Sequence, residues 1–244
     1  MDNFHAIHPP EWCEHPQIKH MKGIDPTLSS IDQFDAIRSF NWTEEQPQVD
    51  LFCSLLNTIS SANPSIIELG SAGVGGSFYS VLFEKWFDKK CTIVNVDPRL
   101  NVLEEVRTYW KDQHLTNAKL HHGYVGIPKH YQARPDFVTD ETPYLRTKDL
   151  MAESNIQKLD ILHADIQGSE VSLLQELVTD DLVKSIHYFF ISTHSGENVN
   201  TYHPCSEILS SSMNCKFHFS DPHRGGWGDG LIVAENLDWT ASIV

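Results

Sequence analysis

Apolar and polar positions follow one another in blocks along this chain, and the blocks are typical of alternating strands and helices. Short apolar runs that fit buried strands lie at 65–69, 91–96, 118–123, 159–164 and 186–192. Between several of these runs, apolar residues recur every three or four positions, which predicts helices at about 77–88, 99–113 and 168–178. Such alternation predicts βαβ units around a parallel sheet.

The two ends of the chain depart from this alternation. Residues 1–45 contain turn-forming stretches and little periodicity, so we expect an N-terminal cap or lid before a main domain over residues 46–244. Pro47 suits the first position of a helix whose apolar face continues to Ile59. The long connection over 124–150 is typical of a lid or a binding loop.

The last two apolar runs, at 215–220 and 229–236, lie too close together for a crossover helix between them. They therefore predict an antiparallel hairpin on the edge of the sheet. The expected fold class is α/β, with a doubly wound, mostly parallel seven-stranded sheet that ends in this antiparallel C-terminal hairpin.

Composition narrows the possible partners and the location. The chain has 244 residues, 18 Lys and Arg against 33 Asp and Glu, and a formal charge of −15, which disfavours nucleic acid and anionic lipid surfaces. No run approaches the roughly 18 apolar residues of a membrane helix, and the N-terminus lacks the pattern of a signal peptide. The five cysteines are scattered, as in a cytoplasmic protein with free thiols. We expect no nucleic acid and no membrane as partners, and nothing supports an oligomer.

A glycine-rich stretch, ELGSAGVGGS (68–77), follows the first predicted strand, where a doubly wound sheet binds its ligand. The dinucleotide fingerprint G-x-G-x-x-G would need a glycine at position 72, which is Ala72. Glu68 would suit a cationic or hydroxyl-rich ligand better than a phosphate. Asp97, Asp165 and His194 end three further predicted strands, so four titratable groups should converge at one edge of the sheet.

This set of strand-end residues resembles that of class I S-adenosylmethionine-dependent methyltransferases. The stretch LHADIQGSEVSLLQEL (162–177) resembles the D-x-E-G-x-E signature of the FkbM-type branch, and the resemblance extends over about residues 65–236. It implies that the methionine portion of the cofactor is held by Glu68, Gly70, Ser71 and Gly73, the ribose by Asp97, and the adenine border by His122, Gly123 and Tyr124. Asp165 would lie between the cofactor and the acceptor.

The sequence departs from the family pattern in three places. His163 stands where a lysine is usual, Gln167 stands in place of a glutamate, and the glycine loop is at least one residue longer. A hydroxyl acceptor must lose a proton, which His194 could accept as a base with a pKa near 6.5. Alternatively, a divalent ion such as Mg could acidify the hydroxyl, held by Asp165 and His194 with help from His163 or Asp229.

We therefore expect an S-adenosylmethionine-dependent O-methyltransferase that acts on a small hydroxylated acceptor, and the resemblance implies a sugar or glycosylated metabolite. A nicotinamide-dependent oxidoreductase and a methyltransferase-like module that binds without turnover remain as alternatives. Structural readings also stay open: Asp97 and Asp165 could cap helices, and His194 could be an ordinary loop histidine. Arg224 and Trp227 could form a flap over the acceptor, or only a hairpin turn.

Overall fold

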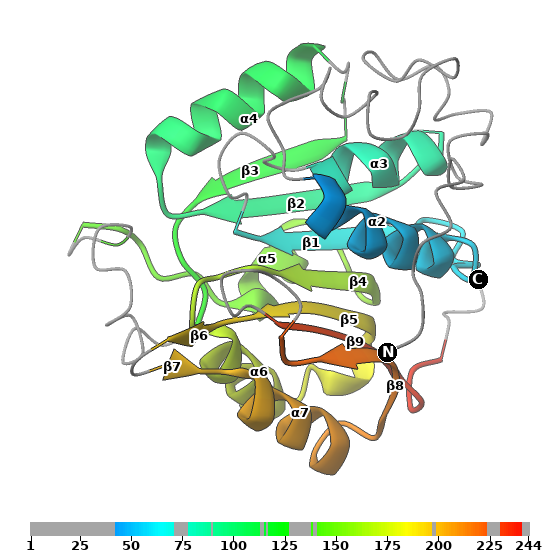
Figure 1. Cartoon of the computed structure of the whole chain (residues 1–244). Helices are drawn as coiled ribbons and strands as arrows, with labels where there is room; N and C mark the ends of the chain where they lie inside the picture. Colours follow the sequence, from blue (N-terminus) through cyan, green and yellow to red (C-terminus); the bar gives the residue numbers. More distant parts are fainter. Residues whose placement is uncertain are drawn as a thin grey trace.

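A computed structural model describes residues 42–70, 78–88, 90–112, 115, 117–126, 138, 141–196, 199–223 and 230–240. These residues form a seven-stranded sheet between two layers of helices (Figure 1). A separate two-stranded pair joins β6 (Ser195–Gly196) to β7 (Val199–Asn200). Within the described ranges, no helix combines the length and the apolar character needed to cross a membrane.

The sheet has the strand order β3-β2-β1-β4-β5-β9-β8. Its strands are β1 (Ser65–Leu69), β2 (Thr92–Asp97), β3 (Ala118–His122), β4 (Leu159–Ala164), β5 (Ile186–Thr193), β8 (Cys215–Asp221) and β9 (Gly230–Asn236). The first five are parallel, whereas β9 runs antiparallel to both β5 and β8. This confirms the predicted fold class. The chain order reverses between β1 and β4, and an open α/β sheet binds ligands beside such a switch point.

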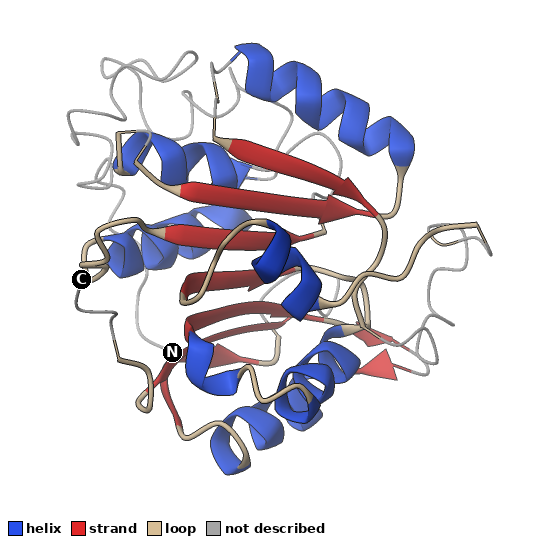
Figure 2. Cartoon of the chain, turned by 180° about the vertical axis from the view of Figure 1, so that it is seen from behind, coloured by secondary structure: helices blue, strands red, loops and turns tan. Residues whose placement is uncertain are grey.

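Helices cover the two faces of the sheet (Figures 1 and 2). One face packs against α2 (Trp42–Leu56), α3 (Phe78–Trp86) and α4 (Leu100–Asp112). The other face packs against α5 (Thr147–Glu153), α6 (Glu170–Thr179) and α7 (Tyr202–Ser211). A short 3₁₀ turn, Val183–Ser185, leads into β5. This three-layer arrangement is expected for a parallel sheet, because the helices that connect its parallel strands cross over its two faces.

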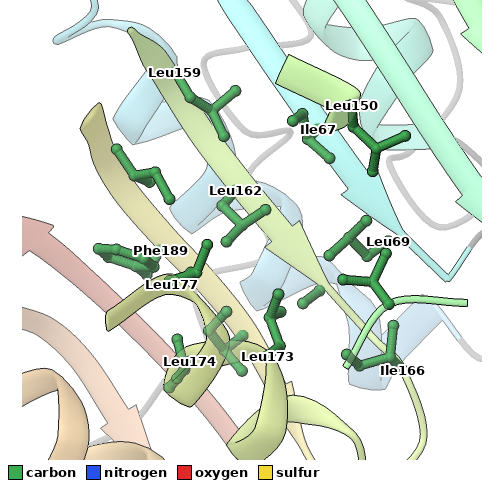
Figure 3. Packing of buried hydrophobic residues seen from close by; sticks show 14 of the residues in the cluster. Ile67, Leu69, Leu150, Leu159, Leu162, Ile166, Leu173, Leu174, Leu177 and Phe189 are labelled. Atoms are coloured by element: carbon green, nitrogen blue, oxygen red, sulfur yellow. The ribbon is translucent and has the colours of Figure 1, made fainter. Parts of the chain in front are cut away.

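The apolar core explains why the strands could be predicted from the sequence. All residues of β1 and β4 are buried, because both faces of these central strands are covered. Figure 3 shows one side of this core, where Leu162 of the sheet packs near Leu173 and Leu177 of α6. Each buried leucine contributes about 1.5–3 kcal/mol relative to an exposed one, so this packing holds the helices against the sheet.

Two helix assignments differ from the sequence prediction. The prediction that Pro47 starts a helix is wrong, because α2 begins at Trp42 and ends at Leu56. The residues just before Pro47 have no apolar period that could have indicated the earlier start. The short helix α5 was not predicted either. The proposed cap over residues 1–45 lies almost entirely outside the described residues, so the domain boundary stays a prediction.

Candidate active site

Backbone hydrogen bonds join the ends of the parallel strands at the left of the sheet in Figure 1. The N–H of Gly70 donates to the carbonyl of Val96 at 2.8 Å, which ties the end of β1 to β2. The N–H of Asp165 donates to Leu69 at 2.9 Å, and the N–H of Gly123 donates to Asp97 at 3.1 Å. The predicted residues at the ends of β1, β2, β3 and β4 therefore lie along one edge.

Gly70 occupies a position that admits only glycine. Its φ of +84° lies in the left-handed region, and a Cβ atom placed there would lie 1.9 Å from the carbonyl oxygen of Asp165. The end of β1 thus passes directly against the end of β4, as expected beside the switch point. Ser71 and Gly73, the other predicted contacts of the glycine loop, lie outside the described residues.

Glu68 is buried and accepts hydrogen bonds from its own protein. Its Oε2 accepts from the N–H of Ser80 at 3.2 Å, from the hydroxyl of Ser80, and from Nδ2 of Asn95 at 3.1 Å. Ser80 lies in the first turn of α3, so Glu68 satisfies one of the N–H groups that a helix leaves unpaired there. Burial raises the pKa of Glu68 to about 7, although these hydrogen bonds oppose the rise. A direct contact between Glu68 and the cofactor stays a prediction.

His163 lies beside Glu68 on the neighbouring strand. Its Nδ1 is 3.9 Å from Oε1 of Glu68, and its ring packs 4.4 Å from the ring of Tyr79. Burial lowers the pKa of His163 to about 4, against the opposing charge of Asp165. A neutral imidazole forms no salt bridge at pH 7, so the contact with Glu68 is not an ion pair. His163 is therefore a buried, uncharged residue on the α3 side of the sheet.

Asp97 forms a two-pronged ion pair with Arg99. Oδ1 accepts from the backbone N–H of Arg99 at 2.8 Å and from its Nε at 3.0 Å, while Oδ2 accepts from Nη2 at 3.0 Å. The Asp97 side chain is fully buried, whereas that of Arg99 is 25% exposed. Arg99 therefore lies on the solvent side of the pair and fixes the orientation of the Asp97 carboxylate. Sequence reasoning missed Arg99, although it lies two residues beyond Asp97 in the motif NVDPR.

The residues predicted to border the adenine lie at the end of β3 and just after it. The ring Nε2 of His122 lies 3.0 Å from the carbonyl of Pro98, which places His122 next to the end of β2. Tyr124 forms an isolated parallel bridge with Tyr144, and their rings are 5.5 Å apart. A Cβ atom added to Gly123 would lie 2.6 Å from the side chain of Leu145. The end of the predicted 124–150 binding loop therefore packs beside the end of β3, whereas residues 127–137, 139 and 140 of that loop lie outside the described residues.

Asp165 and His194 meet at the ends of β4 and β5. Nε2 of His194 lies 3.2 Å from Oδ1 of Asp165, and Nε2 of Gln167 donates to that oxygen at 3.1 Å. The Asp165 side chain is 30% exposed, whereas that of His194 is 11% exposed. Asp165 is therefore the member of this pair that faces outward.

Sequence reasoning also missed Glu170, which lies on the other side of His194. The Nδ1 of His194 is 2.8 Å from Oε1 of Glu170, and the Glu170 side chain is fully buried. Its signal in the sequence was its match to the last acid of the D-x-E-G-x-E signature, three residues beyond Gln167. The imidazole of His194 thus lies between two carboxylates, those of Asp165 and Glu170.

These charges fix the protonation states of the site. Burial alone would lower the pKa of His194, but Glu170 and Asp165 outweigh it and raise that pKa well above its ordinary value. Burial would likewise raise the pKa of Asp165, but the hydrogen bond and charge of His194 lower it. Gln167 Nε2 lies 2.8 Å from Nε2 of His194 and could donate only to a neutral ring. The raised pKa favours a protonated ring, which donates to Asp165 and is not a base with the ordinary pKa near 6.5.

The metal alternative gains no support from this part of the chain. Among the residues that the structure describes, no group of three or more His, Cys, Asp or Glu side chains is arranged to hold a metal ion. Both ring nitrogens of His194 face carboxylates, so its contacts with Asp165 and Glu170 occupy the positions a metal would need. Asp229, Arg224 and Trp227 lie outside the described residues.

Comparisons with known proteins identify the fold. No protein-family model and no curated protein matches the chain. The methyltransferase domain of METTL16 is 12% identical over 79% of this chain and 67% of that chain, with a TM-score of 0.53. A candidate rRNA-methylase from Clostridium thermocellum is 7% identical over 80% of this chain and 97% of that chain, with a TM-score of 0.52.

A weaker structural similarity is found to fibrillarin from Aeropyrum pernix in complex with natively bound S-adenosyl-L-methionine. It has a TM-score of 0.45 and 14% identity, and covers 75% of this chain and 73% of that chain. The fold assignment rests on the first two structures and on the strand order, which agree. The chain has the fold of the class I S-adenosylmethionine-dependent methyltransferases.

Proposed function

We propose that this protein is an S-adenosylmethionine-dependent O-methyltransferase that acts on a hydroxyl group of a small acceptor. The observation that supports it most is the meeting of Gly70, Asp97 and Asp165 at one edge of the sheet, through backbone hydrogen bonds between β1, β2 and β4. In this arrangement the Asp97 carboxylate, on one side of the glycine turn, would bind the ribose of a nucleoside ligand. A second carboxylate lies on the other side, where an acceptor would bind.

Two features favour S-adenosylmethionine over a dinucleotide, whereas Asp97 suits either cofactor. Asp97 is held in place by Arg99, and a carboxylate at the end of the second strand typically binds the ribose hydroxyls of a nucleoside cofactor. Ala72 breaks the fingerprint that cradles a pyrophosphate. Glu68 is a buried carboxylate two residues before Gly70, and the donors to it among the described residues, Ser80 and Asn95, are uncharged. A carboxylate at this place suits a cationic ligand and disfavours a phosphate.

The acceptor side of the proposal rests on Asp165. S-adenosylmethionine, when bound, supplies an electrophilic methyl group, so the protein must hold the acceptor oxygen in line with it. The Asp165 carboxylate is outward-facing and is kept ionised by His194, so it can accept a hydrogen bond from a hydroxyl. As the acceptor oxygen bonds to the methyl carbon, the bond between that carbon and the sulfonium sulfur would break and S-adenosylhomocysteine would leave, while the Asp165 carboxylate would accept the hydroxyl proton. The FkbM-type resemblance supports a sugar or a glycosylated metabolite as the acceptor.

A methyl-transfer screen tests the proposal. The purified protein is incubated with S-adenosylmethionine carrying a labelled methyl group and with a panel of sugars, glycosides and other hydroxylated metabolites. Label should appear on a hydroxyl oxygen of one class of acceptor, and Asp165→Asn should reduce it strongly. If the protein binds S-adenosylmethionine but labels no acceptor, it is a binding module without turnover. Hydride transfer with a nicotinamide cofactor would establish the oxidoreductase alternative.

A further inference from the structure

Glu170 is the first residue of α6, and one of its oxygens accepts three hydrogen bonds. Its Oε1 accepts from the N–H of Ile166 at 3.3 Å, from the N–H of Gly168 at 3.1 Å, and from Nδ1 of His194 at 2.8 Å. The first two donors belong to the turn after β4, and the third lies at the end of β5. One buried side chain therefore connects the two strand ends that carry Asp165 and His194.

The turn that Glu170 holds has an unusual backbone. Gln167 has φ +53° and Gly168 has φ +104°, so both lie in the left-handed region. Gln167 is the one of the two that has a side chain. Such a conformation is unfavourable for a non-glycine residue, and it persists only where its surroundings impose it. Glu170 accepts the N–H groups on either side of Gln167. It thereby directs the Gln167 amide toward Oδ1 of Asp165.

His194 is fixed at its backbone as well as at its ring. Its N–H donates to the hydroxyl of Thr201 at 2.9 Å, and its carbonyl accepts from the N–H of Thr201 at 3.0 Å. With the backbone held by Thr201 and Nδ1 held by Glu170, the ring has one direction left for Nε2. That direction leads to Oδ1 of Asp165, 3.2 Å away.

The charge of Glu170 is compensated only in part. Among the described residues, its Oε2 is buried without a hydrogen-bond partner, and a buried carboxylate is unfavourable unless it is paired. The partners of Glu170 are instead on Oε1: the ring of His194 and the N–H groups of Ile166 and Gly168. An apolar residue at this position would leave the N–H groups of Ile166 and Gly168 and the Nδ1 of His194 without this acceptor. Glu170 therefore holds the 165–168 turn and the His194 ring to the same oxygen.

We propose that Glu170 is a positioning residue of the acceptor site: it holds the imidazole of His194 and the 165–168 turn as one unit, with Nε2 directed at the Asp165 carboxylate. This inference rests on the proposed methyl transfer and deepens it. The Glu170 side chain is fully buried, which leaves it no surface for a cofactor or an acceptor. It acts through His194, which keeps Asp165 ionised and oriented toward the hydroxyl.

Nuclear magnetic resonance on ligand-free protein labelled with ¹⁵N-histidine tests the geometry without any activity. The Nδ1–H of His194 should give a far-downfield proton resonance that exchanges slowly, and this resonance should be absent in His194→Gln. Glu170→Gln should shift it upfield or broaden it. Glu176→Gln is the matched control, because it removes a carboxylate of the same helix, one that accepts from Thr147 and Tyr144 rather than from His194. It should leave the resonance unchanged.

Kinetics then test the role. Glu170→Gln should lower kcat by about 100-fold, the loss typical of a misplacement of about 1 Å, with KM for S-adenosylmethionine within about twofold. The positioning role would be overturned if Glu170→Gln left turnover unchanged, or if it left the His194 resonance unchanged. If the resonance responds as expected while the wild-type protein methylates no acceptor, the proposed function fails and the positioning geometry stands.

Discussion

Replacing Gly70 with alanine tests the close approach of β1 and β4, on which the whole site depends. The new Cβ atom would lie 1.9 Å from the carbonyl oxygen of Asp165, and the backbone at φ +84° would have to hold a side chain. The steric overlap and the backbone strain arise at one residue, and the backbone of Gly70 is also fixed by the hydrogen bond from its N–H to Val96. The substitution should therefore displace the Asp165 peptide or open the end of β1.

The expected cost is the sum of two effects. A left-handed conformation costs a residue with a Cβ atom about 1–2 kcal/mol, and a steric overlap that forces a backbone shift costs about 1–3 kcal/mol. Together they predict a loss of about 2–5 kcal/mol in the free energy of unfolding. For a domain of this size each kcal/mol lowers Tm by about 2–4 °C, so Tm should fall by about 4–20 °C.

Thermal unfolding followed by circular dichroism measures this loss. Asn155→Ala is the matched control, because Asn155 is exposed and has φ +55°, so it isolates the cost of the left-handed backbone. That variant should lose only about 1 kcal/mol. If Gly70→Ala lost no more than Asn155→Ala, the close approach of Asp165 to Gly70 would be wrong. The same result would remove the reason for requiring glycine at the turn.

Three further changes test the site. Asp165→Asn should lower turnover about 10²–10⁴-fold while calorimetry shows nearly unchanged binding of S-adenosylhomocysteine; equal turnover would exclude the proposed role. Asp97→Asn should weaken that binding by about 2 kcal/mol, since hydrogen bonds to a charged group are lost, and unaltered affinity would place the ribose elsewhere. Glu68 has a pKa of about 7 in the folded protein against an ordinary 4.5, so its stabilising contribution is complete below pH 4.5 and is lost as the pH rises through 7. Urea unfolding at pH 5 and pH 8 should therefore show a smaller loss of stability for Glu68→Gln than for the wild type, and equal losses would mean that Glu68 is ionised throughout.

The sequence predicted the sheet well because its central strands are buried on both faces. Such strands are continuous apolar runs, and β1 and β4 match the predicted ranges 65–69 and 159–164. The start of α2 and the short helix α5 were missed because neither carries an apolar period long enough to detect. Element boundaries without such a pattern depend on tertiary contacts.

The sequence predicted which strand ends form the candidate site, but not which side chains contact one another there. Asp97, Asp165 and His194 could be placed at one edge because parallel strands end together. Which side chains touch depends on rotamers and burial, so Arg99 and Glu170 escaped notice. Burial and neighbouring charge also change the chemistry of residues that were identified. They lower the pKa of His163 to about 4 and raise the pKa of His194 well above its ordinary value.

The most direct test of the account is calorimetric titration of the purified, folded protein with S-adenosylmethionine, S-adenosylhomocysteine and NAD. The account predicts binding of both sulfur ligands in the micromolar range and no heat with NAD. A folded protein that binds NAD, or that binds neither sulfur ligand, would contradict the assignment of the glycine turn and its flanking carboxylates to S-adenosylmethionine.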